Sequence, residues 1–94
     1  MNLESIDNFY EFLVSDYIQE NLAGKYDDEE FLVDVACVAL NQLPARYVRH
    51  RVDLMFFMPF QERTKMEADV VHAVKTAIEF VEKHRRKRPD TITQ

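Results

Sequence analysis

Three arginines and a tyrosine lie close together near the middle of the chain, at Arg46, Tyr47, Arg49 and Arg51. A guanidinium group binds phosphate or carboxylate through two parallel hydrogen bonds, and it can also bind the O6 and N7 edge of guanine. Its planar face, like the ring of Tyr47, can stack on a purine. These residue types indicate a site for an anionic, phosphate-bearing ligand. The alternative is a solvated turn in which Tyr47 and Val48 pack inward.

A predicted helix that ends at a proline positions this cluster, and we call residues 41–51 the elbow. Pro44 disfavours helical geometry at the residue before it, Leu43, so the helix ends there. The preceding run "FLVDVACVAL" places apolar residues around most of a helix circumference, which is typical of a helix surrounded by protein. We therefore expect a central helix over 28–42 with Asp27 as its N-cap.

Two further helices are predicted, one on either side of the central helix in the sequence. The first covers 3–23, with Asn2 or Ser5 as its N-cap and Gly24 as a left-handed C-terminal cap. The third covers 60–87 and ends in a run of basic residues. Each carries an apolar stripe at helical spacing, namely Ile6, Tyr10, Leu13 and Tyr17 in the first, and Met66, Val70, Val74, Ala77 and Val81 in the third.

The segment 51–58, "RVDLMFFM", alternates in a way that suggests a strand, although both of its faces are largely apolar. The chain offers no second predicted strand to pair with it. It is either a short buried helical turn or a strand that pairs with the same segment of a second copy, and we favour the homodimer because it buries the apolar residues. The expected fold is all-α, with three to four helices in one domain over 1–88 and a tail at 89–94.

The charges are unevenly distributed along the 94 residues. Residues 1–42 contain ten acids and one base, whereas residues 43–94 contain seven acids and eleven bases. With a net charge of −5, bulk attraction to nucleic acid is disfavoured, yet a local basic patch can still hold a small phosphate-bearing ligand or an acidic protein. The basic run 83–88 is interpreted as a solvated helix end. No apolar run is long enough to span a bilayer and no signal peptide is recognisable, so a cytoplasmic protein is expected.

The sequence contains no recognisable nucleophile motif or glycine-rich phosphate loop, so we expect neither an enzyme nor a bound cofactor. Asp34, Cys37 and Asn41 share one face of the predicted central helix. An amide and a single thiol make a poor zinc-binding set, and an isolated cysteine in an apolar helix is more often a packing residue. No metal site is therefore expected.

The stretch "DVACVALNQLPARYV" closely resembles the signature of the ComFB family of late competence development proteins, at Asp34, Asn41, Leu43, Pro44 and Tyr47. The resemblance implies a small, mainly helical bacterial homodimer that is not an enzyme. Related proteins resemble receptors for cyclic dinucleotides, chiefly cyclic di-GMP. Ala45 departs from the family pattern, which usually has a second proline there, and the extra cysteines of zinc-binding members are missing.

Two hypotheses follow for the elbow. The first is a dimeric signalling module, linked to competence or motility, that binds a cyclic dinucleotide through Asn41, Arg46, Tyr47, Arg49 and Arg51. The alternative is a structural or adaptor homodimer whose arginines dock an acidic protein partner. Binding of single-stranded nucleic acid by the elbow and the basic run is the least favoured reading, and it would predict an affinity that falls steeply with salt.

Overall fold

The computed structural model describes residues 3–49 and 58–86. The expected all-α class is confirmed, since α-helices account for most of the described residues and the strands are two residues long. The elements in chain order are η1 (Leu3–Ser5), β1 (Asp7–Asn8), α1 (Phe9–Asn21), α2 (Glu29–Gln42), β2 (Tyr47–Val48) and α4 (Phe60–Arg86). The tail and nearly all of the segment 51–58 lie outside the described residues, so the strand expected there stays a prediction.

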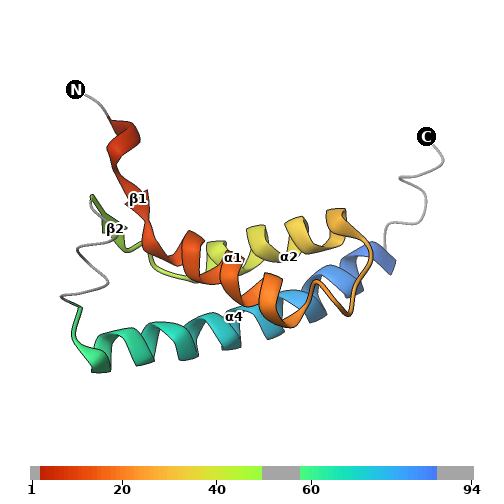
Figure 1. Ribbon diagram of the computed structural model, residues 1–94. Coiled ribbons are helices and arrows are strands. Elements are labelled where there is room, and N and C mark those ends of the chain that lie inside the picture. The colour runs from red at the N-terminus through yellow and green to blue at the C-terminus, as the bar shows by residue number, and fades with distance from the viewer. Residues whose placement is uncertain (1–2, 50–57, 87–94) are drawn as a thin grey trace.

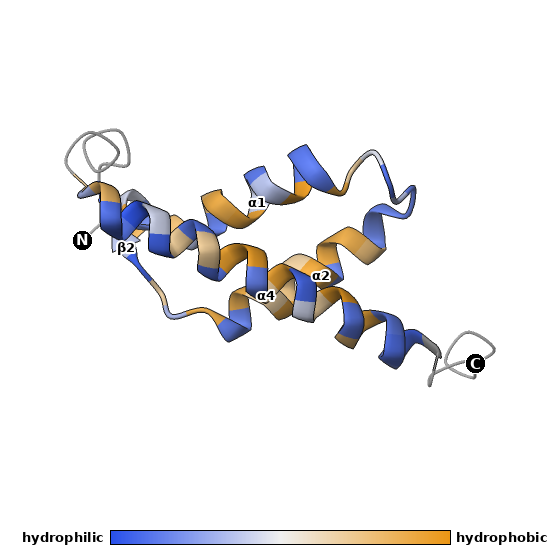
Figure 2. Cartoon of the chain, turned by 90° about the horizontal axis from the view of Figure 1, so that it is seen from below, coloured by the Kyte–Doolittle hydropathy of each residue, from blue (hydrophilic) through white to orange (hydrophobic). Residues whose placement is uncertain are grey.

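The three α-helices of residues 3–49 and 58–86 form two layers. α1 and α2 lie side by side in one layer, and the long α4 runs beneath both of them (Figure 1). α4 packs more extensively against α2 than against α1. Its hydrophobic and hydrophilic residues alternate along its length with helical spacing, as expected for an amphipathic helix that covers one face of a layer (Figure 2). This arrangement brings β2 and the start of α4 to the same end of the molecule as β1 (Figure 1).

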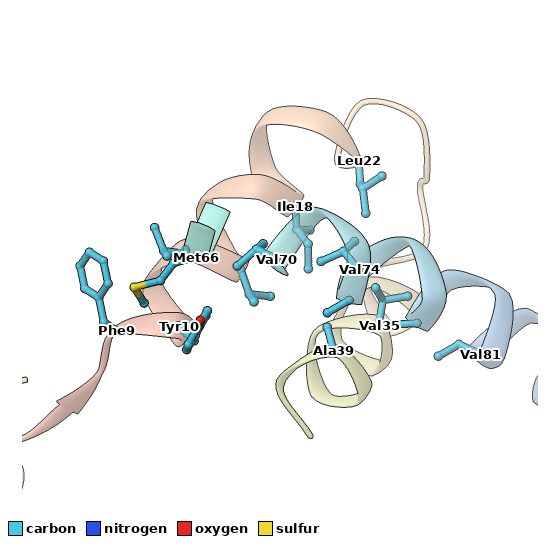
Figure 3. Packing of buried hydrophobic residues seen from close by; sticks show 14 of the residues in the cluster. Phe9, Tyr10, Ile18, Leu22, Val35, Ala39, Met66, Val70, Val74 and Val81 are labelled. Atoms are coloured by element: carbon cyan, nitrogen blue, oxygen red, sulfur yellow. The ribbon is translucent and has the colours of Figure 1, made fainter. Parts of the chain in front are cut away.

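The core lies where the two layers meet, and labelled side chains from α1, α2 and α4 point into it (Figure 3). Phe9, Val35 and Val74, one from each helix, are fully buried. The predicted stripe of α4 is confirmed in full, since each of its five members is at most 5% exposed. Burial of apolar side chains supplies the main stabilisation of such a fold.

The central helix α2 contacts both other helices, as expected, but only one of its faces is covered. Phe31, Val35 and Ala39 are buried in the core, whereas Val33 is 62% exposed and Cys37 is also exposed. Two helices can cover only part of a third, and α1 and α4 leave the Val33 side open. The apolar residues around the helix therefore do not all face protein within this chain.

The first helix begins later than the sequence suggested. The N-cap of α1 is Asn8, whose side chain accepts a hydrogen bond from the backbone N–H of Tyr10, so the expected cap at Ser5 is wrong. Asn2, the other candidate, lies outside the described residues. The residues before Asn8 form η1 and β1 instead, and Ile6, assigned to the apolar stripe, is 44% exposed. Pairing of β1 with β2 replaces the first turns of the predicted helix.

Two other predicted caps are also wrong. α1 ends at Asn21, with Leu22 as its C-cap, whose backbone N–H donates to the carbonyl oxygen of Ile18 at 2.8 Å, and Gly24 has no positive φ angle. α2 is capped by Asp28 rather than by Asp27, with the Asp28 carboxylate accepting from the N–H of Phe31. The C-terminus of α1 therefore ends in right-handed helical geometry without a glycine cap. The N-terminus of α2 is capped by a side chain one position later than predicted.

Within the described residues, none of the helices has both the length and the apolar character that crossing a membrane would require.

Candidate functional site at the elbow

A short antiparallel ladder attaches the elbow to the start of α1. Asp7 in β1 is paired with Val48 in β2, and Asn8 is paired with Tyr47. Sequence periodicity did not reveal this ladder, because two-residue strands are too short to show an alternating pattern. The ladder fixes where the backbone of the elbow lies relative to the helical core.

Asn8 strengthens this attachment through a single side-chain oxygen. Its Oδ1 accepts from the backbone N–H of Tyr10 at 3.2 Å and from the backbone N–H of Arg46 at 2.9 Å. In addition, the N–H of Phe9 donates to the carbonyl oxygen of Arg46 at 2.7 Å. The residue that caps α1 therefore also holds the elbow, over a separation of 38 positions in the sequence.

The side chain of Arg46 already has a partner within the chain. Its Nε donates to Glu62 Oε2 at 2.9 Å, and the two side chains are 40% and 37% exposed. An ion pair this exposed contributes only a little to stability, about 0.2–1 kcal/mol. The ion pair holds the Arg46 guanidinium group against the start of α4, and the Glu62 carboxylate offsets its positive charge. The sequence did not indicate this pairing.

Tyr47 and Arg49 are the two residues of the predicted arginine and tyrosine cluster that the structure shows as exposed. Tyr47 is 66% exposed and Arg49 is exposed, whereas Val48 between them is buried at 7%. Tyr47 and Val48 point to opposite sides of β2, and Arg49 follows directly after the strand. The alternative of a solvated turn expected both Tyr47 and Val48 to pack inward, and this holds for Val48 alone. Arg51 lies outside the described residues.

The signature residues at the end of α2 serve the local geometry of the helix end. The amide nitrogen of Asn41 lies 3.9 Å from Cys37 Sγ, one turn earlier on the same exposed face. Leu43 is the C-cap, its N–H donates to the carbonyl oxygen of Leu40 at 3.3 Å, and its side chain packs partly against the core. Pro44 is exposed directly after it. The expected helix stop at Leu43 and Pro44 is confirmed.

Asp34, the first signature residue, contacts the far end of α4 instead of the elbow. Arg85 donates from Nη2 to Asp34 Oδ2 at 3.2 Å and from Nη1 to Asp28 Oδ2 at 2.8 Å. Its guanidinium carbon lies 5.4 Å from the centre of the Phe31 ring. The hydrogen bond from Arg85, together with that from the Phe31 N–H, lowers the pKa of Asp28 below its ordinary value.

The interpretation of the basic run as a merely solvated helix end is therefore wrong for Arg85. The contact was not predicted, because residues 51 positions apart carry no local signal of their pairing. The only hint in the sequence was the opposite charge of an acidic N-terminal half and a basic C-terminal half. Asp34 and Arg85 act together as a clamp between α2 and the end of α4.

Comparison with known proteins agrees with the signature. A family model described as late competence development protein ComFB matches residues 7–85, which is most of the chain. Searches of curated proteins and of solved structures gave no match.

Proposed function

The chain belongs to the ComFB family of late competence development proteins, and from this premise we propose that it is a non-enzymatic signalling module that binds a cyclic dinucleotide at the elbow. Cyclic di-GMP is the first candidate ligand. The observation that supports the proposal most directly is the exposure of both Tyr47 and Arg49, which lie two positions apart in and directly after a strand held by backbone hydrogen bonds. A backbone held in place with two exposed, planar side chains can bind a ligand without first being ordered.

The chemistry of the two side chains suits the two parts of such a ligand. The Tyr47 ring offers a flat surface on which a guanine can stack, a contact worth about 1–3 kcal/mol per base. The Arg49 guanidinium can bind a phosphate, or the O6 and N7 atoms of guanine, through two hydrogen bonds. The Nε of Arg46 is taken by Glu62, whose carboxylate also offsets the charge of the guanidinium, so Arg46 can assist mainly through its Nη atoms and we assign the leading role to Arg49.

A homodimer is part of the proposal, because a cyclic dinucleotide with two identical halves matches two elbows related by a two-fold axis. Exposed apolar side chains at this end of the molecule support it. Phe60 at the start of α4 is 79% exposed, and Leu3 in η1 is 62% exposed. Figure 1 shows both elements at the same end of the molecule as β2. η1 lies above β2 and the start of α4 lies below it in that view, so this end of the molecule exposes an apolar side chain on either side of the elbow, where a partner copy could cover them.

Isothermal titration calorimetry with cyclic di-GMP tests this function on four proteins. We expect the wild type to bind with a stoichiometry of about one nucleotide per two chains. Arg49→Ala and Tyr47→Ala should each weaken binding by at least about tenfold, because the first removes a pair of guanidinium hydrogen bonds and the second removes a stacking contact. Lys25→Ala removes one positive charge from the exposed connection between α1 and α2, and it should leave the affinity unchanged.

Two results would oppose the proposal. Absence of heat from the wild type at about 50 µM nucleotide would remove the ligand, because a physiological receptor must bind more tightly than that. Equal losses in Arg49→Ala and Lys25→Ala would show general charge attraction without a site at the elbow. The adaptor alternative predicts no nucleotide binding and an acidic protein partner that is lost in Arg46→Ala/Arg49→Ala.

A further inference from the structure

An apolar groove of about 270 Å³ lies between α1 and α2. The described residues that line it come from these two helices and from Ala23 in their connection, and all of them precede the elbow. Leu32, Ala36 and Leu40 recur every four positions along one side of α2 and form one wall. Val14 and Ile18 of α1 line the opposite wall of the groove. The groove is therefore a second candidate surface, separate from the nucleotide site.

The edges of the groove are exposed and acidic. Glu11 from α1 and Glu29 from α2 line it, and Val33 on the same side is 62% exposed. In the whole stretch 9–42, eight acidic residues are accompanied by a single base, Lys25. Two of those acids, Asp28 and Asp34, are paired with Arg85 and do not line the groove. The negative potential at the rim is therefore not offset by that clamp.

This charge disfavours a second copy of the chain as the occupant. A two-fold contact through the groove would bring two copies of the same acidic rim, each with Glu11 and Glu29, into one interface. Like charges placed opposite one another across an interface cost several kcal/mol and exclude partners. The complementary partner carries basic residues on either side of an apolar ridge.

We propose that the groove is a docking site for an amphipathic helix of another protein, one with lysine or arginine residues flanking its apolar face. The lining residues of α2 run from Glu29 to Leu40, which at 1.5 Å per residue is about 16 Å, or about three helical turns. A partner helix of that length presents apolar anchors at i, i+4 and i+7 to the groove. Its basic flanks meet Glu11 and Glu29.

The test uses the full chain and two fluorescein-labelled synthetic helical peptides of about 16 residues. One peptide has leucines along one face and lysines beside them, and the other has glutamate in place of every lysine. Fluorescence anisotropy should show saturable binding of the lysine peptide and at least about tenfold weaker binding of the glutamate peptide. Added salt should weaken the lysine peptide's binding, because exposed charges are screened.

Variants then locate the binding. Val33→Arg places a positive charge at the groove on an exposed position, so the fold should persist, and it should weaken the lysine peptide by at least about tenfold. Ala68→Arg introduces the same group on an exposed position of α4 and should change the affinity by less than about twofold. Glu11→Lys, a second rim variant, should weaken the lysine peptide and strengthen the glutamate peptide. Circular dichroism and thermal melting verify that each variant is folded.

Several outcomes would overturn the proposal. These are the absence of saturable binding up to about 100 µM, equal affinity for the two peptides, or peptide binding unchanged in both Val33→Arg and Glu11→Lys. Sedimentation velocity supplies the remaining outcome. A wild-type dimer that dissociates in Val33→Arg would show that the groove binds a second copy of this chain, against the charge argument. The nucleotide titration is independent of all of these results, because it concerns residues of the elbow.

Discussion

Replacing Asn8 with alanine removes the one side-chain oxygen that serves two backbone N–H groups, those of Tyr10 and Arg46. Loss of the N-cap bond costs about 1 kcal/mol. Leaving the part-buried Arg46 N–H without its acceptor costs about 1 kcal/mol more. We therefore predict that Asn8→Ala lowers the free energy of unfolding by about 2 kcal/mol, which for a domain of this size lowers Tm by about 8–16 °C.

Urea unfolding followed by far-UV circular dichroism measures this change in the free energy of unfolding. Two matched variants serve as controls that identify its cause. Asn8→Asp retains an oxygen that can accept both bonds and suits a helix N-terminus, so its stability should stay within about 0.5 kcal/mol of the wild type. Asn21→Ala removes the same side-chain group from the other end of α1. There the amide donates to the carbonyl oxygen of Tyr17 on the exposed surface, so the loss should be below about 0.5 kcal/mol.

The reasoning fails if Asn8→Ala and Asn21→Ala destabilise equally, because the connection to the elbow would then contribute nothing. It also fails if Asn8→Asp is as unstable as Asn8→Ala, since the lost oxygen would not be the cause. Hydrogen exchange at the Arg46 amide gives a local readout. Exchange there should accelerate in Asn8→Ala by more than global unfolding explains, because that amide loses its only described acceptor.

Two further predictions concern the core and the clamp. Val74→Ala, at a position with no exposed surface, should cost about 2 kcal/mol through lost burial and a residual cavity, whereas Val33→Ala should stay within about 0.5 kcal/mol in the same denaturation assay. Arg85→Met should raise the pKa of Asp28 toward its ordinary value, as measured by NMR titration of the carboxyl carbon. Because the folded-state pKa of Asp28 is lowered, the contact stabilises the wild type above the unfolded pKa of about 4, and this stability is lost as the pH falls through the folded pKa. Arg85→Met should show a smaller acid-dependent loss, because only the backbone hydrogen bonds to Asp28 remain.

The helical class and the positions of two helices follow from local sequence patterns alone. The stripe from Met66 to Val81 recurs with helical spacing, so α4 was predicted almost to its ends. Pro44 restricts the residue before it, so the stop of α2 was predicted as well. Both features depend on neighbours within a turn or two. The signature around the elbow also indicated the family, because it is a continuous stretch of the chain.

Which of these residues contact one another depends on how the helices pack. Asn8 and Arg46 are joined across 38 positions, and Asp34 and Arg85 across 51, and neither separation leaves a periodic pattern. The apolar circumference of α2 likewise did not reveal that Val33 stays open, because the covered face depends on where α1 and α4 pack. Local backbone preferences fix helices, whereas pairing and exposure depend on contacts between distant segments that form only when the helices pack together.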